Sequence, residues 1–448
     1  MRFVNTATDF SGMLRRKYPA ALHNLYMLPV FGGKYILRNA KKPELLAPAG
    51  SLNKLKTAII YGADAVYVGG EEFSLRVAAE NFSPRDMADG VEFAHSRGKK
   101  VYLTANIIPH NSDIAEYERF LKEYRKSGFD AVILSDLGMF AMTRELAPEL
   151  EIHVSTQANN VNWRSALEWH RMGAKRVILA REMSCAEIAE IRGKTPPELE
   201  LEAFVHGAMC ISYSGRCLLS NYMTGRDSNL GACAHPCRWK YYLTEEKRPG
   251  EYMPVFENER GTFIYNSKDL CMIEHIGELI GCGLDSFKIE GRVKSEYYLA
   301  TVVKVYREAI DAYFENPDGY TFNPAWMEEL KKVSHRDYTT GFYFGKPGGS
   351  EQQYSSSSYI RNYELLGIVT GYDENSHMLS VVQKNRFFKG SEVEFLRPHG
   401  DFVKMKISYM ENEDGEELEV ANRPQDIVRI KTDIPVECES MMRAPREN

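Results

Sequence analysis

The sequence predicts an α/β protein, a (β/α)8, TIM-like barrel followed by a small C-terminal antiparallel β domain. Two observations predict the barrel. Eight short apolar runs end in small or polar residues, and amphipathic stretches separate them. Several of these stretches end in a glycine that is typical of a helix C-terminus, namely Gly62, Gly128, Gly173 and Gly283. Strands that alternate with helices form parallel βαβ units, and eight such units favour a closed barrel.

The eight predicted strands follow one another along the chain. They cover residues 44–50, 65–70, 101–106, 131–136, 151–157, 176–182, 201–207 and 286–292. The segment between the last two strands, residues 208–285, is long, and loops after barrel strands form the active-site face. A doubly wound open sheet is the alternative, but no GxGxxG motif follows the first strand.

The chain continues beyond the eighth strand with a helical segment at 297–316, and we bound the barrel domain at residues 43–346. Residues 347–362 are rich in Ser and Gly at their start and are predicted to form a flexible linker. Residues 363–445 alternate apolar and polar positions between turn signals. This pattern predicts a small β-barrel or β-sandwich domain.

The first 42 residues differ from the rest of the chain in charge. They contain eight Lys and Arg residues and one acid, Asp9, whereas the whole chain has a net charge of −6. We interpret residues 1–42 as a basic, poorly ordered extension, with an organellar targeting segment as the alternative. Because the whole chain is acidic, any nucleic-acid site must be a local feature of its surface.

The composition also bears on the compartment. No apolar run approaches the ~20 residues of a membrane helix, so we expect no membrane contact. Half of the eight cysteines share one loop of a large chain, which does not resemble a secreted disulfide framework. We therefore expect a reducing, cytoplasmic compartment.

That cysteine loop carries the strongest chemical signal in the sequence. Cys210, Cys217, Cys233 and Cys237 lie within 28 residues, between the seventh and eighth predicted strands. Thiolates at this density suit an iron–sulfur cluster or a structural zinc ion. The spacing departs from the short C-x2-C pairs of most zinc sites and favours the cluster. A thiol peptidase built on His206 and Cys210 is a further alternative, although membership of a four-cysteine set is better explained by ligation.

Polar residues on the predicted strands are the other candidates. Because alternate side chains of a strand share a face, three such sets are expected near the barrel mouth. They are His153 with Gln157, Glu202 with His206, and Lys288 with Glu290 and Arg292, and Arg181 follows the sixth strand. A structural ion-pair network, for example Lys288 with Glu202, is the alternative, since buried charges require partners.

Two basic and aromatic stretches could bind RNA by phosphate contacts and base stacking. The first contains Arg238, Trp239 and Lys240 beside the last cysteine, and the second contains Arg386 and Lys389 in the small domain. An exposed cationic face of a strand would give the same pattern.

The segment EAFVHGAMCISYSGRCLLS (202–220) resembles the signature of the U32, collagenase-like peptidase family. The segments ELLAPAG, DAVYVGG, STQANN, LAREMS, ACAHPCRWKY, FKIEGRVKS and TTGFYFG are also similar to that family, and the resemblance covers residues 44–445. The name of the family implies proteolysis, but some of its branches resemble oxygen-independent hydroxylation factors for tRNA, ribosomal RNA or ubiquinone. Chain length and the C-terminal domain make the chain most similar to the prephenate-dependent tRNA uridine 5-hydroxylases.

The resemblance implies a tRNA substrate, prephenate as the oxygen source, and a 4Fe–4S cluster on Cys210, Cys217, Cys233 and Cys237. We infer from charge that Arg181, Lys288 and Arg292 bind the small dianionic co-substrate. His153 and Gln157 complete the predicted substrate-binding set, and His206, Glu202 and Glu290 form the predicted catalytic set. A peptidase, or a non-catalytic RNA-binding scaffold acting with a paralogous family member, remains the alternative.

Overall fold

The structure is a computed structural model. It describes residues 27–30, 34–37, 41–74, 81–209, 219–226, 228, 233–234, 236, 257–258, 261–262, 268–345 and 359–446. Eight parallel strands form a closed barrel, because the last strand pairs with both the first and the seventh. They are β3 (Glu44–Pro48), β4 (Ala65–Gly69), β5 (Lys100–Ala105), β6 (Ala131–Leu134), β7 (Glu151–Val154), β8 (Arg176–Ile178), β9 (Glu200–Ala208) and β13 (Ser286–Ile289). All eight predicted strands are confirmed, in the predicted order.

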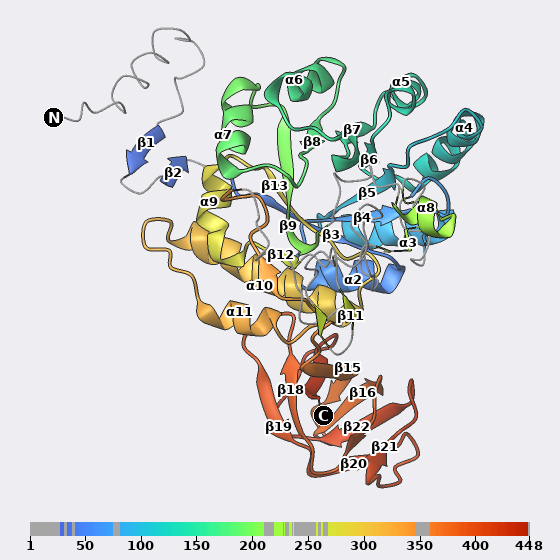
Figure 1. The fold of residues 1–448 in the computed structure, drawn as a ribbon. Coiled ribbons are helices and arrows are strands. Elements are labelled where there is room, and N and C mark those ends of the chain that lie inside the picture. Colours follow the sequence, from blue (N-terminus) through green and yellow to red (C-terminus); the bar gives the residue numbers. More distant parts are fainter. Residues whose placement is uncertain are drawn as a thin grey trace, which may run out of the picture.

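Helices alternate with these strands and cover the outside of the barrel (Figure 1). They are α2 (Leu52–Ile60), α3 (Pro84–His95), α4 (Asp113–Tyr124), α5 (Leu137–Leu146), α6 (Trp163–Arg171), α7 (Cys185–Lys194), α9 (Ile276–Gly281) and α10 (Glu296–Glu315). Short 3-10 turns are η1 (Arg125–Ser127), η2 (Thr156–Ala158) and η5 (Ile273–His275). Local sequence sets the helix starts: Ser83 and Ser184 both form capping boxes that satisfy N-terminal N–H groups.

The apolar interior of the barrel domain is formed by strand residues and by the inner faces of the helices. Both faces of the strands are buried, as in β4, where all five residues are buried. α10 is the longest helix, with 20 residues, and most of its first half is buried against the barrel. None of the helices in the described ranges is long and apolar enough to cross a bilayer.

The segment after β9 adds structure at the mouth of the barrel. β12 (Asp269–Cys271) pairs antiparallel with the end of β9, and β14 (Tyr338–Thr339) pairs with β12. The short helices α8 (Leu219–Thr224) and α11 (Pro324–Leu330) and the strand pair β10 (Glu257–Asn258) and β11 (Gly261–Thr262) complete the described elements of this domain. The cysteine loop therefore leaves from the C-terminal end of a barrel strand, as predicted.

The C-terminal domain is a separate antiparallel β structure with its own core, which confirms the predicted class (Figure 1). Its seven-stranded sheet has the order β19-β18-β23-β15-β16-β22-β20, and β17 pairs with β21. The strands are β15 (Tyr363–Asp373), β16 (Met378–Gln383), β17 (Phe387–Phe388), β18 (Glu392–Leu396), β19 (Val403–Lys406), β20 (Met410–Glu411), β21 (Val420–Ala421), β22 (Ile427–Lys431) and β23 (Met441–Pro445).

Most of the predicted extension 1–42 and most of the predicted linker 347–362 lie outside the described residues. Within the extension, β1 (Met27–Val30) and β2 (Lys34–Leu37) form an antiparallel hairpin, and β2 lies beside α9.

Candidate active site

The interior of the barrel contains a buried ion-pair network. Arg176, the first residue of β8, donates hydrogen bonds to Glu44 (2.6 Å), Glu200 (2.7 Å) and Glu202 (2.8 Å). Lys288 of β13 donates to the other oxygen of Glu202, also at 2.8 Å. Glu44 and Glu200 begin their strands, so the network extends inward from the N-terminal end of the barrel, opposite the mouth.

This network contains two of the predicted site residues, Glu202 and Lys288. Burial alone would raise the pKa of Glu202, but Lys288 and Arg176 outweigh it and lower the pKa to about 2. The charge of Lys288 is thus neutralised by Glu202, and Lys288 is not available to bind a dianion. His153 is fully buried beside Tyr102, with ring centroids 4.7 Å apart, and burial keeps its pKa well below the usual value. The structural alternative, an ion-pair network, describes Glu202 and Lys288, whereas the substrate-binding role of His153 stays a prediction.

His206 lies in a different environment from Glu202. The pairing of β9 with β13 changes register between Phe204 and His206, so the two-residue alternation of faces is interrupted there. His206 packs against three tyrosines, Tyr298 and Tyr306 of α10 and Tyr338 of β14, with ring centroids 5.5–6.0 Å apart. The prediction that Glu202 and His206 share a face is therefore wrong.

Burial lowers the pKa of His206 to about 3, with further lowering by Lys294 and His335. The imidazole is 1% exposed, and its Nδ1 lies 3.4 Å from the hydroxyl of Tyr306. A neutral, enclosed histidine suits a structural role better than general acid or base catalysis. Glu290, also in the predicted catalytic set, is tied into the same region because its backbone N–H donates to the His206 carbonyl at 2.9 Å.

The mouth of the barrel carries the remaining candidates. Arg181, after β8, donates to the backbone carbonyl of Ala208 at 2.6 Å, and its guanidinium lies 4.0 Å from the centre of the Phe204 ring. Arg292, after β13, donates to Thr104 at 2.9 Å. A side chain at Gly69 would place its Cβ 2.5 Å from Arg292 Nη1, so a glycine there makes room for the guanidinium. Both arginines lie at strand C-termini, as predicted.

Amide side chains line the same end of the barrel. Asn106 follows β5 and donates to Ser155 Oγ at 3.3 Å, and that hydroxyl also accepts the N–H of Gln157 at 3.2 Å. Asn160 follows on the same loop, and its backbone carbonyl oxygen accepts a hydrogen bond from the N–H of Ala180 at 3.1 Å. Only Gln157 of this group was predicted. A search of strand ends for amides as well as charges would have found Asn106 and Asn160.

The cysteine loop is described only in part. Cys210, Cys217 and Cys237 lie outside the described residues, as do Arg238, Trp239 and Lys240. Cys233 is half-buried, and the N–H of the next residue, Ala234, donates to the buried Ser220 of α8 at 2.9 Å. Ser220 follows Cys217 by three residues. This bond therefore holds the chain next to Cys233 against the start of α8.

In the predicted RNA-binding stretch of the small domain, the two basic residues differ in their neighbours. Lys389 donates to Glu417 at 2.5 Å and to Glu419 at 2.9 Å, so its charge is balanced by two acids. These acids compete with phosphate for Lys389, and the RNA-binding role of Lys389 stays a prediction. Arg386 lies 5.3 Å from the ring of Phe388, whose side chain is 45% exposed, and this pair keeps the predicted combination of cation and aromatic surface.

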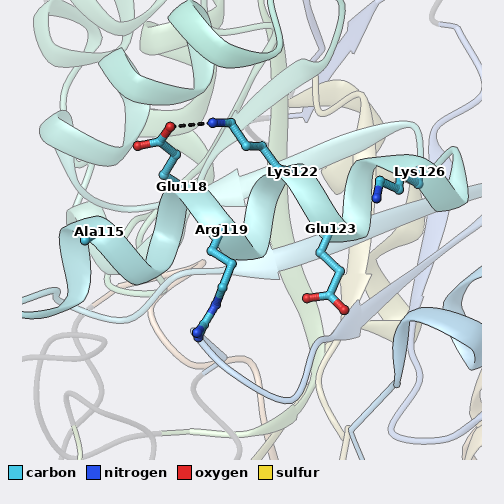
Figure 2. Close-up of a pocket in the computed structure, with 6 residues that line it drawn as sticks. All are labelled: Ala115, Glu118, Arg119, Lys122, Glu123 and Lys126. Atoms are coloured by element: carbon cyan, nitrogen blue, oxygen red, sulfur yellow. Dashed lines mark hydrogen bonds and ion pairs between the residues drawn. The ribbon is translucent and has the colours of Figure 1, made fainter.

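Two hollows of the surface lie away from the mouth. One, of about 540 Å³, runs along α4 and is lined by Ala115, Glu118, Arg119, Lys122, Glu123 and Lys126. Figure 2 shows Glu118 paired with Lys122 on one side of the helix while Arg119 and Glu123 point to the other. The second, of about 340 Å³, lies at the opposite end of the barrel, beside Arg176. The alternating charges of the first hollow are those of a solvated helix surface.

Fold and site define a class of protein: a (β/α)8 barrel with a cysteine-bearing loop at its mouth and an appended antiparallel β domain. The comparison with known families is specific. Residues 50–353 match peptidase family U32, and residues 361–443 match the peptidase family U32 C-terminal domain. The chain belongs to peptidase family U32.

Three relatives are similar over most of their length. The tRNA hydroxylation protein P1 of Bacillus subtilis is 44% identical, over 92% of this chain and 97% of the relative. The tRNA hydroxylation protein P of Escherichia coli is 40% identical, over 89% and 95%. A protein of Porphyromonas gingivalis named collagenase is 32% identical, over 74% of this chain and 83% of its own.

Proposed function

We propose that this protein is an enzyme that hydroxylates tRNA, converting a wobble uridine to 5-hydroxyuridine with prephenate as the oxygen source and a 4Fe–4S cluster as cofactor. The observation that carries the proposal is the 40–44% identity to two tRNA hydroxylation proteins over nearly the whole chain. The similarity includes both the barrel and the C-terminal domain. We expect the protein to act in the cytoplasm, where its tRNA substrate is found, and a paralogous family member is a candidate partner.

The donor set is suited to the proposed cluster. Four cysteine thiolates are the usual ligands of a 4Fe–4S cluster, and Cys210, Cys217, Cys233 and Cys237 would supply them. The Ser220–Ala234 hydrogen bond supports this assignment, because it fixes the position of Cys233, the residue before Ala234, beside α8. When bound, the cluster would supply electron transfer, and the protein would hold it at the end of the barrel where Arg181 and Arg292 lie.

Arg181 and Arg292 are the residues of this chain best placed for the carboxylates of prephenate. A guanidinium forms paired, charge-assisted hydrogen bonds to a carboxylate. Arg181 donates to Ala208 and Arg292 donates to Thr104, so the position of each guanidinium is set before a ligand arrives. Lys288 is excluded from this role by its pairing with Glu202.

Proteolysis is the second candidate function, favoured by the name of the Porphyromonas gingivalis relative. A thiol peptidase needs a histidine that can exchange a proton with its cysteine and its substrate. His206, the histidine of the proposed His206–Cys210 pair, is enclosed by tyrosines, and burial lowers its pKa to about 3, so it stays neutral at physiological pH. The geometry of His206 therefore supports the hydroxylation proposal over a peptidase built on His206 and Cys210.

The test is to express the chain in a bacterial strain that lacks its own tRNA hydroxylation proteins and to measure tRNA nucleosides by mass spectrometry. We expect 5-hydroxyuridine-derived nucleosides to return with the wild-type chain and with Cys438→Ser, an exposed cysteine of the C-terminal domain. Cys233→Ser should not restore them. Protein purified without air should contain about four iron and four sulfide per chain, and Cys233→Ser should lose them.

Two results would contradict the proposal in different ways. A wild-type protein that is expressed and iron-loaded but leaves tRNA unmodified would overturn the hydroxylation. Stoichiometric zinc in place of iron and sulfide would overturn the cofactor assignment.

A further inference from the structure

A set of buried amide groups at the barrel mouth lacks hydrogen-bond partners. Both side-chain atoms of Asn160, Oδ1 of Asn106 and Oε1 of Gln157 are buried without a partner in the structure. Asn160 is the extreme case, because its residue is only 1% exposed. An unpartnered buried polar atom costs about 1–3 kcal/mol, so such atoms are rare unless a ligand or water completes them.

These amides are positioned by the ends of β5, β7 and β8. Ser155 joins Asn106, after β5, to Gln157, after β7. Asn159 takes a left-handed backbone conformation (φ 52°), which asparagine tolerates better than most residues. The next residue, Asn160, is then fixed to the end of β8 through its bond with Ala180. We call Asn106, Gln157 and Asn160 the amide group.

The kind of unpartnered atom indicates the kind of ligand. Three of the four unpartnered atoms of the amide group are side-chain carbonyl oxygens, which accept hydrogen bonds. A dianion such as prephenate brings carboxylate oxygens, which are acceptors too, so it would leave these carbonyls unsatisfied. The amide group requires a ligand that carries N–H donors beside carbonyl acceptors.

The imide edge of uracil has this pattern, with the N3–H donor between two carbonyl oxygens. A single amide can pair with it twice, because its oxygen accepts N3–H while its NH2 donates to the neighbouring carbonyl. Asn160 is the member with both atoms unpartnered. We propose that the amide group is the nucleobase subsite of this protein, and that Asn160 pairs bidentately with the N3–H edge of the target uracil. This inference rests on the proposed function and names how its substrate base is selected.

The subsite divides the mouth between two ligands. The amide group follows β5 and β7, whereas Arg181 and Arg292 follow β8 and β13. Arg181 links the two parts, since it directly follows Ala180, which holds Asn160. A base and an anionic co-substrate could therefore lie side by side over the barrel, each held by groups of suitable chemistry.

The test measures binding of the cluster-loaded protein to a synthetic anticodon stem–loop RNA by fluorescence anisotropy. Two RNAs are compared, one with uridine and one with N3-methyluridine at the wobble position, since methylation removes the donor. The wild-type protein should bind the methylated RNA roughly tenfold to a hundredfold more weakly, the range expected for loss of a bidentate base contact. Asn160→Leu, and separately Asn160→Asp, should weaken binding of the uridine RNA by a similar factor.

Combining Asn160→Leu with the N3-methyluridine RNA tests whether the two changes remove the same contact. If Asn160 pairs with N3–H, Asn160→Leu should bind the two RNAs about equally, because the methyl group then removes a bond that is already lost. Asn53→Leu, the same change at an exposed position of α2, should keep the wild-type preference. Circular dichroism and thermal unfolding check that each variant is folded, and the wild-type comparison of the two RNAs needs no variant.

The outcomes separate the inference from the function on which it rests. Equal affinity of the wild-type protein for the two RNAs, with hydroxylation of tRNA intact in cells, would overturn the nucleobase subsite and leave the proposed function standing. An Asn160→Leu variant that keeps the full preference for uridine would overturn the role of Asn160. A wild-type protein that neither binds the uridine RNA nor modifies tRNA would overturn both.

Discussion

Lys288 and Arg292 carry the same charge at opposite ends of one stretch of chain, yet their surroundings give them different tasks. Lys288 lies inside the barrel and pairs with Glu202, so its charge contributes to the stability of the fold. Arg292 lies beyond the end of β13, bonded to Thr104 at the mouth. Removing one partner of a buried ion pair is costly, since it leaves a buried charge uncompensated. We therefore assign function to the arginines at the mouth and stability to the interior charges.

His206 should make stability depend on pH. The folded protein keeps this imidazole neutral down to about pH 3, because burial lowers its pKa, whereas a histidine in the unfolded chain titrates near 6.5. The unfolded state thus binds the extra proton between these values. The free energy of unfolding should fall as the pH falls through this window, by about 1.4 kcal/mol per pH unit from this group alone.

His206→Gln should reduce this dependence by about one proton in urea unfolding measured between about pH 6 and 5. His110→Gln, at an exposed histidine, is the control and should keep the wild-type slope. An unchanged slope in His206→Gln would show that the tyrosine environment does not exclude the proton.

For single residues, the sequence predicts which side chains lie at the barrel mouth better than it predicts which groups surround them. Arg181, Gln157 and Arg292 lie at the mouth because each follows the end of an apolar run, which can be read from the sequence. The enclosure of His206 depends on Tyr298 and Tyr306 of α10, about a hundred residues away in the chain, together with a register shift. A period-two pattern contains neither the shift nor the distant partners.

The strand β9 is the element on which the site depends. It pairs with β8 and β13 in the barrel and with β12 beyond it, and the cysteine loop leaves from its end. Gly207 makes this exit possible. Its φ is +109°, and a Cβ at this position would lie 2.7 Å from the backbone oxygen of Glu290.

Gly207→Ala should therefore strain the backbone and push β9 away from the end of β13. We expect a loss of about 1–3 kcal/mol in the free energy of unfolding and a lower iron content, since the displaced exit carries the cysteines. Gly193→Ala in α7, where a Cβ would meet nothing within 4 Å, should be neutral or slightly stabilising. Equal stability and iron content in Gly207→Ala and the wild type would contradict this account.

The elements themselves were largely predictable because each contains its own signals. Apolar runs of four to six residues, glycines after helices, and Ser83 or Ser184 before them are local features. The second pairing of β9 with β12 was not predicted, because β12 has only three residues and its partner precedes it by about sixty positions. Tertiary pairing determines such short strands more than their own sequence does.

At the scale of the molecule, the C-terminal domain is joined to the barrel by buried contacts rather than by the linker alone. Tyr61, at the end of α2, donates to the carbonyls of Leu396 and Glu439, both at 2.9 Å. Lys304 of α10 donates to the carbonyl of Gly400 at 2.9 Å. The end of β18 and the segment before β23 thus contact the end of α2, and the turn after β18 contacts α10. These hydrogen bonds join the surfaces of the two domains.

The centre of this interface is an ion network around Arg443. Arg443 of β23 has no exposed surface and bonds to Glu394 of β18 and to Glu329 of α11. Lys332 contacts the same two carboxylates, at 2.7 Å to Glu394 and 3.0 Å to Glu329. The sequence does not reveal this interface, because its charges are separated by up to 114 residues and resemble ordinary surface positions one at a time.

Arg443→Met should consequently weaken the union of the two domains. It removes the guanidinium and leaves Lys332 beside both buried carboxylates, with the exposed Lys404 3.6 Å from Glu394, so we expect a loss of about 3–5 kcal/mol in stability. Scanning calorimetry should then resolve separate transitions for the barrel and the C-terminal domain, whereas we expect a single transition for the wild type. Arg446→Met, at an exposed arginine three residues later, should behave as the wild type. A single transition at the wild-type temperature in Arg443→Met would show that apolar contacts alone hold the domains together.

Affinity for the uridine stem–loop RNA, measured on the same variant below its first transition, should fall if the continuous surface across both domains is the one that binds RNA.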